Sequence, residues 1–392
     1  MVTLRFFHLS DLHIGRQLHH YNLMEDQRKV LGEIAAYAAD LHPDAVVIAG
    51  DIYDKSVPSA EAVTVFDEFL TALSAIEPSI PILVISGNHD SPERLSYASG
   101  FLRAHHIYVA GNAPEHGGEH IPMVTLPDEF GEVDFYLLPF LKPSYVKDVW
   151  EGGGPESSSD AVRMLIERED IDFAGRRNVL VSHQFYTGEG IRPGTCDSET
   201  VAVGGSDNVD TGPVKPFDYV ALGHLHGAQK VGENHIRYCG TPMKYSVSES
   251  GHDKSLAMVI LREKGEEAEV VRLPLHPVRD VRKKRGKLQD ILSRPQEEGR
   301  DDYVSITLTD ETEPYKPKEQ LEQLYSHILE VRIDNERIRQ KLTEFDEEIV
   351  WKSPMSAFGD FYEEMQGREL DEEEEKILEQ VIDWAGEEEN RR

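Results

Sequence analysis

Short apolar runs alternate with longer amphipathic stretches over the first part of the chain. The runs are rich in β-branched and aromatic residues and occupy positions 4–9, 45–49, 82–86, 135–139, 179–182 and 219–222. Their length and composition predict β-strands. Between the first three runs the apolar residues recur at helical spacing, so helices are expected to alternate with strands. This alternation is typical of βαβ units, in which helices cover a sheet.

Residues 59–76 carry the clearest helical pattern. Ser59 is placed to cap the N-terminus of the helix, and Glu61 puts a negative charge in its first turn, where it is favourable. One face carries the apolar side chains of Val63, Phe66, Phe69, Leu70, Leu73 and Ile76. A helix with one apolar face buries it against another element, which here predicts packing on the sheet.

The predicted strands follow one another more closely after about residue 230. Further strands are predicted at 235–239, 255–261 and 268–273. Their short connections favour an antiparallel second sheet. Beyond residue 276 the chain shows strand, helix, strand, helix and strand patterns at 278–283, 287–293, 303–309, 317–327 and 328–333. This order predicts a small α/β unit, so the expected parts of the chain are residues 1–275, 276–345 and 346–392.

The composition narrows the class of protein. A chain of 392 residues with 39% hydrophobic residues and a mean hydropathy of −0.47 is typical of a soluble globular protein with two or more domains. It has no apolar run near the roughly 18 residues that predict a membrane span. The two cysteines, Cys196 and Cys239, form no CxxC motif, which argues against a disulfide framework and a thiolate metal site. We therefore expect a cytoplasmic protein without a membrane partner.

The charge is large and uneven. A net charge of −32 argues against a protein that binds nucleic acid with its whole surface. Residues 321–392 carry 22 acidic against nine basic residues. By contrast, six basic residues crowd into nine positions: Arg279, Arg282, Lys283, Lys284, Arg285 and Lys287. A solvated strand and turn would give the same cluster, and the cluster by itself favours that interpretation.

Oxygen and imidazole side chains follow five of the predicted strands. The loops carry Asp11-Leu-His13, Gly50-Asp51, Gly87-Asn88-His89-Asp90, Ser182-His183 and Gly223-His224-Leu225-His226. Because ligands of open α/β sheets bind beyond the carboxyl ends of the strands, these loops are expected to converge on one site. Single DxH or HxH pairs are usually coincidences, but five motifs at five strand ends are not. Two divalent ions about 3.5–4 Å apart would need a shared carboxylate, and mixed imidazole and oxygen donors suit manganese, iron or zinc.

The motifs DxH, GD, GNHD, a strand-end histidine and GHxH, in this order, resemble those of the calcineurin-like metallophosphoesterase superfamily. The longer words LSDLHIG, AGDIYD, ISGNHD, ALGHLH and YCGTPMKYSVSE are similar to the SbcD family of bacterial recombination nucleases. The superfamily motifs span residues 11–226, and the narrower likeness continues through the rest of the chain. This resemblance implies an α/β fold with a sandwich of two β-sheets flanked by helices, a small α/β cap domain and a helical C-terminal tail.

The resemblance also assigns ligands to two divalent metal ions, with manganese as the metal that supports activity. Asp51 is similar to the bridging aspartate of the family. The first ion would be completed by Asp11, His13 and His226, and the second by Asn88, His183 and His224. A water bound to such ions has a pKa of about 7, which gives a hydroxide nucleophile at neutral pH.

Two further residues of the GNHD motif receive catalytic roles from the resemblance. His89 is similar to a histidine that binds no metal, stabilises the transition state and protonates the leaving oxygen. Asp90 would orient the ring of His89. Asp54 stands where some relatives carry a histidine, and we assign it no role.

The function implied is that of a DNA nuclease in repair, recombination and replication. It combines double-strand exonuclease activity with single-strand or hairpin endonuclease activity, linked to ATP through an SbcC-type coiled-coil ATPase. A homodimer within a heterotetramer is expected. In this family the cap helps to select DNA, which favours the cluster from Arg279 to Lys287 as a contact to the DNA backbone.

The final segment predicts two helices with apolar faces, which carry Phe358, Phe361, Tyr362 and Met365 on one and Ile377, Leu378, Val381 and Ile382 on the other. These faces either pack on the cap domain or, as the resemblance implies, bind the ATPase partner. Two other functions stay open. One is a phosphodiesterase for small nucleotides, and the other is a non-catalytic scaffold. The complete ligand set and His89 argue against the scaffold.

Overall fold

The computed structural model describes residues 3–188, 193–199, 207–293, 299–312, 314–335, 354–368, 370–371, 374–378 and 381–382. The chain divides into two compact units. One comprises Met1–Thr307 with Lys316–Arg332, and the other comprises Leu308–Tyr315 with Ile333–Arg392. Among the described residues no helix is both long and apolar enough to cross a membrane.

The first sheet has six strands in the order β16-β15-β1-β4-β5-β6. Its parallel part consists of β1 (Leu4–Leu9), β4 (Ala45–Ala49), β5 (Ile82–Ile85) and β6 (Ile107–Ala110). Two antiparallel strands extend it beyond β1, namely β15 (Ser255–Leu261) and β16 (Glu269–Pro274). The connections include α1 (Met24–Leu41), α2 (Ala60–Ser74), α3 (Pro92–Leu95) and α4 (Ser99–Arg103). Ser59 caps α2 as predicted, because its hydroxyl accepts a hydrogen bond from the amide of Ala62 at 3.1 Å.

The second sheet also has six strands, in the order β13-β14-β12-β9-β8-β7. Its parallel centre consists of β8 (Gly131–Leu138), β9 (Arg177–His183), β12 (Tyr219–Gly223) and β14 (Glu233–Tyr238). The antiparallel edges are β7 (Met123–Asp128) and β13 (Gln229–Val231). Between β8 and β9 lie α5 (Pro143–Val146) and α6 (Ser158–Arg168), and between β9 and β12 a two-stranded sheet pairs β10 (Phe185–Thr187) with β11 (Asn208–Asp210).

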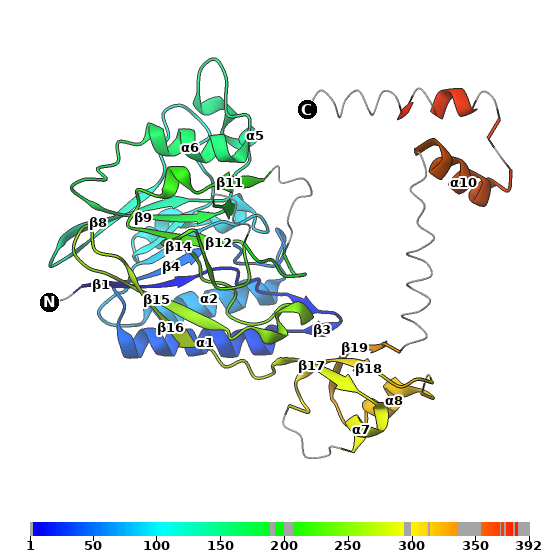
Figure 1. Ribbon diagram of the computed structural model, residues 1–392. Coiled ribbons are helices and arrows are strands. Elements are labelled where there is room, and N and C mark those ends of the chain that lie inside the picture. The colour runs from blue at the N-terminus through cyan, green and yellow to red at the C-terminus, as the bar shows by residue number, and fades with distance from the viewer. Residues whose placement is uncertain are drawn as a thin grey trace. The chain divides into compact units, whose positions relative to one another are not determined.

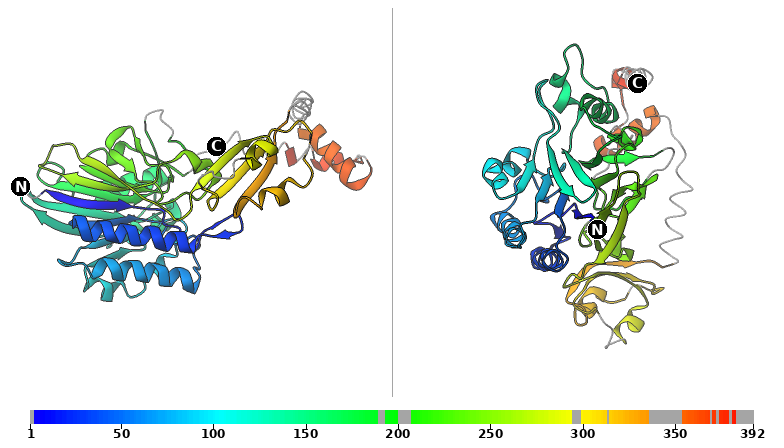
Figure 2. Two further views of the ribbon diagram at one scale, coloured as in Figure 1. Left: turned by 90° about the horizontal axis from the view of Figure 1, so that it is seen from below. Right: turned by 90° about the vertical axis from the view of Figure 1, so that its left-hand side faces the viewer.

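The two sheets lie face to face between helices (Figure 1). A buried cluster with Phe6 and Val47 of the first sheet and Phe135 and Val181 of the second fills the space between them. The opposite face of the first sheet packs on α1 and α2, which are seen end-on beside the sheets in the right-hand view of Figure 2. The opposite face of the second sheet packs on α6. This arrangement confirms the predicted sandwich of two β-sheets flanked by helices.

The expected grouping of the later strands was wrong. Strands 235–239, 255–261 and 268–273 do not share one sheet: β14 pairs in parallel with β12, whereas β15 and β16 extend the first sheet from β1. The reason is burial, because β15 turns Val259 and Leu261 into the core between the sheets, opposite the second one. The connection from 239 to 254 therefore passes from one sheet to the other.

A smaller three-stranded sheet follows in the order β17-β18-β19. It consists of β17 (Val281–Gly286), β18 (Tyr303–Leu308) and β19 (His327–Ile333), with α7 (Leu288–Leu292) and α8 (Pro317–Leu321) in the connections. Its apolar side chains pack with those of the hairpin formed by β2 (Gln17–Leu18) and β3 (Tyr21–Asn22). The order of elements is the predicted one. The boundaries 1–275, 276–345 and 346–392 stay a prediction.

Candidate metal centre

Strand ends of both sheets bring the five motifs together. The first sheet supplies Asp11 and His13 after β1, Asp51 after β4 and Asn88 after β5. The second supplies His183 at the end of β9 and His224 and His226 after β12. Asp11 and His224 are 213 positions apart in the sequence, yet the amide of His224 donates a hydrogen bond to Oδ2 of Asp11 at 3.0 Å. The predicted ligands thus gather where the carboxyl ends of the two sheets meet.

The backbone of these loops is strained. Asp11, His13, Asp51 and His224 have φ angles of 53°, 42°, 51° and 105°. Residues with a Cβ atom seldom adopt positive φ, and the surrounding structure must hold them there. Four of the seven predicted ligands share this feature, so the fold maintains an unfavourable backbone to make their side chains converge.

Glycines in the motifs leave room for this convergence. A Cβ atom on Gly50 would lie 2.4 Å from Nδ1 of His183, and one on Gly87 would lie 2.1 Å from Oδ1 of Asp51. On Gly223 it would lie 1.9 Å from the carbonyl oxygen of Ala49. These distances explain the glycine in the GD, GNHD and GHxH motifs, because any other residue would push the loops apart.

One group of ligand atoms comes from Asp11, His13 and His226, which lie within 4.8 Å of one another. The Nε2 atoms of the two histidines face each other at 3.2 Å. Nδ1 of His13 is buried and has no hydrogen-bond partner within the described part of the chain. Burial lowers the pKa of His13 well below its usual value, so its ring is neutral and keeps a lone pair. A neutral imidazole lone pair is what a metal ion requires.

A second group contains Asn88, His183 and His224. Oδ1 of Asn88 lies 3.2 Å from Nε2 of His183 and 3.0 Å from Nδ1 of His224. His183 donates its Nδ1 hydrogen to the carbonyl oxygen of Ala49 at 2.7 Å, which aims Nε2 at the site. Burial lowers the pKa of His224 to about 3, so this ring is neutral as well.

Asp51 lies between the two groups. Its Oδ2 atom is 3.7 Å from Nε2 of His13 and 3.3 Å from Nε2 of His183. Burial would raise the pKa of Asp51, but the nearby imidazoles of His183 and His13 outweigh this effect and lower it well below its usual range. Although burial acts in the opposite direction, the carboxylate in turn raises the pKa of His183 to about 9. Metal binding at this point would release that proton.

The donor set fits divalent metal ions. It combines carboxylate and amide oxygens with imidazole nitrogens and contains no thiolate. The Nε2 atoms of His13 and His226 face each other, and two neutral imidazole lone pairs in this position are arranged to bind a cation.

His89 lies beside the predicted metal ligands, and the structure corrects one detail of its expected surroundings. Its Nδ1 atom donates to the backbone carbonyl of Asp54 at 2.8 Å, and its amide donates to Oδ1 of Asp51 at 2.8 Å. Asp90 does not orient the ring. Its carboxylate instead accepts from the amides of Gly87, Ile52 and Tyr53. Three backbone donors use the acceptor positions of Asp90, which makes it a brace between two motif loops.

A buried network behind His226 was not predicted. Nδ1 of His226 lies 2.7 Å from the hydroxyl of Ser198, and this hydroxyl donates to Oε1 of Glu249 at 2.7 Å. Lys254 donates to the other oxygen of Glu249 at 2.6 Å. Because the hydroxyl proton points to Glu249, Ser198 accepts the proton of Nδ1 and leaves Nε2 of His226 free for a metal. Burial would raise the pKa of Glu249, but His226 and Lys254 lower it overall. YCGTPMKYSVSE contains Glu249, and this was the available signal.

The contacts of the basic cluster divide it into one covered arginine and several exposed cations. Arg279 donates to Asp26 at 3.0 Å and to Glu25 at 2.8 Å, both on α1, and is largely covered. Arg282 pairs with Asp302 at 2.5 Å. Arg279 is therefore an anchor of the small sheet on α1. The exposed members of the cluster are Arg282, Lys283, Arg285 and Lys287, and Lys284 is half-buried.

The apolar residues of the C-terminal segment are mostly exposed. Within its own compact unit, α10 (Pro354–Gln366) contacts the short helix at 374–378, where the hydroxyl of Tyr362 donates to Glu374 at 2.6 Å. Leu378 is buried, whereas 46% of Phe358 and 58% of Phe361 are exposed. Met365, Ile377 and Val381 are also exposed.

Known proteins resemble this chain at several levels. The family model described as calcineurin-like phosphoesterase matches residues 4–228, more than half of the chain. A second model, described as the type 5 capsule protein repressor C-terminal domain, matches residues 274–366. The SbcD component of the nuclease SbcCD from Staphylococcus epidermidis is 31% identical over 329 residues, which cover 83% of this chain and 84% of that protein.

Solved structures include more distant matches. A dimetal phosphatase from Danio rerio is 13% identical, with a TM-score of 0.42, over 69% of this chain and 99% of that chain. TT1561 of Thermus thermophilus is 12% identical, with a TM-score of 0.37, over the same shares of the two chains.

Proposed function

The chain belongs to the calcineurin-like phosphoesterase family and is a relative of the SbcD component of the nuclease SbcCD, and we propose that it is a metal-dependent DNA nuclease. The observation that carries this proposal is the position of Asp51, whose Oδ2 atom lies between His13 and His183. One carboxylate between two groups of donors is the arrangement that a two-metal phosphodiesterase needs.

We assign two divalent ions to this centre, with manganese as the metal of activity. Asp11, His13, Asp51 and His226 would hold the first ion, and Asp51 with Asn88, His183 and His224 would hold the second. When bound, the ions supply Lewis acidity that neutralises phosphate oxygens and lowers the pKa of water. Ser198, through Nδ1 of His226, and Ala49, through Nδ1 of His183, keep the ligand rings in the required tautomers.

His89 is the group that handles a proton. Because its Nδ1 hydrogen is held by the carbonyl oxygen of Asp54, the ring is fixed and Nε2 is the atom that can carry a second proton. A histidine in this state can donate that proton to the leaving oxygen of the cleaved ester. Asp90 supports it indirectly by holding the loop that contains Ile52 and Tyr53.

DNA is the proposed substrate, and an SbcC-type coiled-coil ATPase is the proposed partner. The protein would act as a homodimer within a heterotetramer, in the cytoplasm, and cut double-stranded ends and single-stranded or hairpin DNA in repair, recombination and replication. The exposed residues Lys283, Arg285 and Lys287 are the proposed contacts of the small sheet to phosphates, which position DNA without reading its sequence.

Cleavage assays test this function directly. We expect no activity after metal removal with EDTA, and recovery with manganese, on linear, hairpin and single-stranded DNA and on bis(p-nitrophenyl) phosphate. The partner ATPase with ATP should stimulate cleavage of DNA without a comparable effect on the small ester. If the protein hydrolyses cyclic nucleotides or nucleotide polyphosphates far better than any DNA, the small-nucleotide phosphodiesterase is the correct function. Inactivity on every ester with manganese would favour the scaffold.

The exposed apolar side chains of the C-terminal segment are the proposed partner contact. Replacing Phe358 and Phe361 together with glutamate should abolish co-purification with the ATPase and any stimulation by ATP, because two charges would enter an apolar interface. Manganese-dependent hydrolysis of the small ester should persist.

Glu375→Ala, at an exposed polar position of the neighbouring short helix, provides the control and should keep partner binding. The measurements are co-purification, cleavage rates and thermal melting. If the double glutamate variant aggregates or melts at a much lower temperature, these side chains belong to the core of the protein itself, and the partner contact is wrong.

A further inference from the structure

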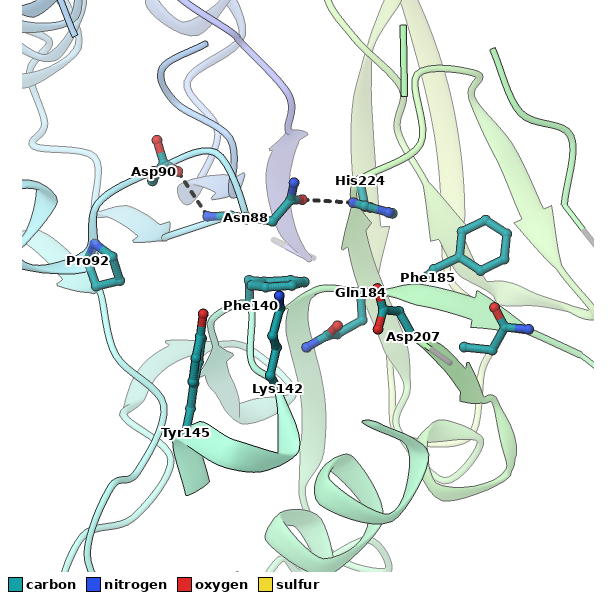
Figure 3. Close-up of a pocket in the computed structure, with 12 residues that line it drawn as sticks. Asn88, Asp90, Pro92, Phe140, Lys142, Tyr145, Gln184, Phe185, Asp207 and His224 are labelled. Atoms are coloured by element: carbon teal, nitrogen blue, oxygen red, sulfur yellow. Dashed lines mark hydrogen bonds between the residues drawn. The ribbon is translucent and has the colours of Figure 1, made fainter. Parts of the chain in front are cut away.

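A cavity of about 270 Å³ opens directly beside the candidate metal centre (Figure 3). Asn88 and His224, both proposed ligands, form part of its wall. The wall continues through the rest of the loop after β5, the segment from the end of β8 into α5, the start of β10 and the start of β11. A group that occupies this cavity would therefore touch a phosphate held at the metal centre.

Lys142 supplies a positive charge in this wall. It is exposed, and it makes no ion pair with any residue in the part of the chain that the structure describes. In Figure 3 its side chain extends from the start of α5 toward the loop that carries Asn88. In a chain with a net charge of −32, an ammonium group next to a phosphodiester site favours a second phosphate there.

Two aromatic rings stand beside Lys142. Tyr145 is 53% exposed, and Phe140 is half-buried, with its ring 6.5 Å from that of His183. Exposed aromatic rings along a cationic groove are the usual stacking platforms for nucleic-acid bases. Asp207 and Asn208 also line the cavity, and because a carboxylate repels phosphate, this part of the wall favours a base over a phosphate.

We propose that this cavity is a subsite for the nucleotide next to the cleaved phosphate in an unpaired stretch of DNA. Tyr145 and Phe140 stack on its base, and Lys142 pairs with its outer phosphate. Bases inside a duplex are already stacked and paired, so only an unpaired or frayed nucleotide can reach the rings. This inference rests on the proposed nuclease function and adds where single-stranded substrate is recognised.

Two substrates that differ by one nucleoside test the subsite. Bis(p-nitrophenyl) phosphate offers no nucleoside, whereas thymidine 5′-(p-nitrophenyl phosphate) places one beside the cleaved bond. With the full chain and manganese, Tyr145→Ala should lower kcat/KM for the thymidine ester by about 5- to 100-fold, the range for one lost stacked base, and much less for the nucleoside-free ester. Tyr145→Phe keeps the ring and should stay within about twofold of the wild type.

Binding of a fluorescein-labelled oligothymidylate, measured by anisotropy in EDTA, tests Lys142. Lys142→Ala should weaken binding and reduce the slope of log affinity against log salt by about 0.7, the value for one phosphate contact of a single strand. Tyr97→Ala and Lys29→Ala, at exposed positions outside the cavity, are the matched controls and should resemble the wild type.

The possible outcomes separate this inference from the nuclease function. If the wild type cleaves DNA but Tyr145→Ala loses no more on the thymidine ester than on bis(p-nitrophenyl) phosphate, and Lys142→Ala binds the oligothymidylate as the wild type does, the subsite is wrong and the nuclease function stands. If the variants lose both esters equally and melt early, the side chains support the fold, which also overturns the subsite. If the wild type hydrolyses the small esters but no DNA, both proposals fall.

Discussion

Asp51→Ala should lose DNA cleavage and small-ester hydrolysis by at least about a thousandfold, and it should retain less metal than the wild type. The physical reason is that Oδ2 of Asp51 lies between His13 and His183, so its removal weakens both groups of donors at once. Residues that merely support a ligand typically cost about 10- to 100-fold, and a shared ligand should exceed that range. The measurements are kcat/KM with manganese and the metal content per chain by mass spectrometry.

Asp67→Ala, at an exposed position of α2, is a matched control for the loss of one carboxylate and should behave as the wild type. Because the neighbouring histidines lose an anionic partner, the folding of the Asp51 variant has to be checked, and melting curves in EDTA do this. A variant that keeps a full complement of metal and near-normal rates would remove the bridging role. So would an experimental structure with both ions bound and Asp51 in contact with neither.

His89→Ala should lower the rate of DNA cleavage by about 10²- to 10⁴-fold while metal content stays unchanged, because proton transfer by a positioned histidine contributes this much. The loss should be much smaller with a p-nitrophenyl ester, whose leaving group departs without a proton. A matched control is His105→Ala, an exposed histidine between α4 and β6. Loss of bound metal would indicate that His89 is a ligand. Equal losses of rate on both substrates would indicate electrostatic stabilisation without proton transfer.

Much of the site followed from local patterns. A short apolar run marks a buried strand whatever it pairs with, and the residue after its last apolar position lies at the edge of the sheet. For this reason β1 and β4 end where the sequence places them, and Asp11 and Asp51 stand at those ends. Ser59 was equally predictable, since a helix cap bonds an amide three residues away.

The tertiary structure decided what depends on distant contacts. In the sequence, Arg279 is one more cation of a basic cluster. In the structure, its guanidinium donates a hydrogen bond to Asp26, 253 positions earlier, and this contact holds the small sheet. Asp90 lies next to His89 in the sequence, yet its carboxylate accepts hydrogen bonds from the backbone amides of residues 52 and 53. The adjacency of two residues in the chain says little about which atoms face each other once loops with positive φ have turned.

The sequence by itself determined the class of fold and the residues that gather at the centre, because strand periodicity and strand-end ligands are local properties. It could not allocate β14 and β15 to different sheets, since strand pairing is settled by which apolar side chains fill the space between the sheets. Nor could it place Ser198 and Glu249 behind His226. These two residues lie 51 positions apart, and a buried hydrogen bond between them exists only after the connection from one sheet to the other has folded over the site.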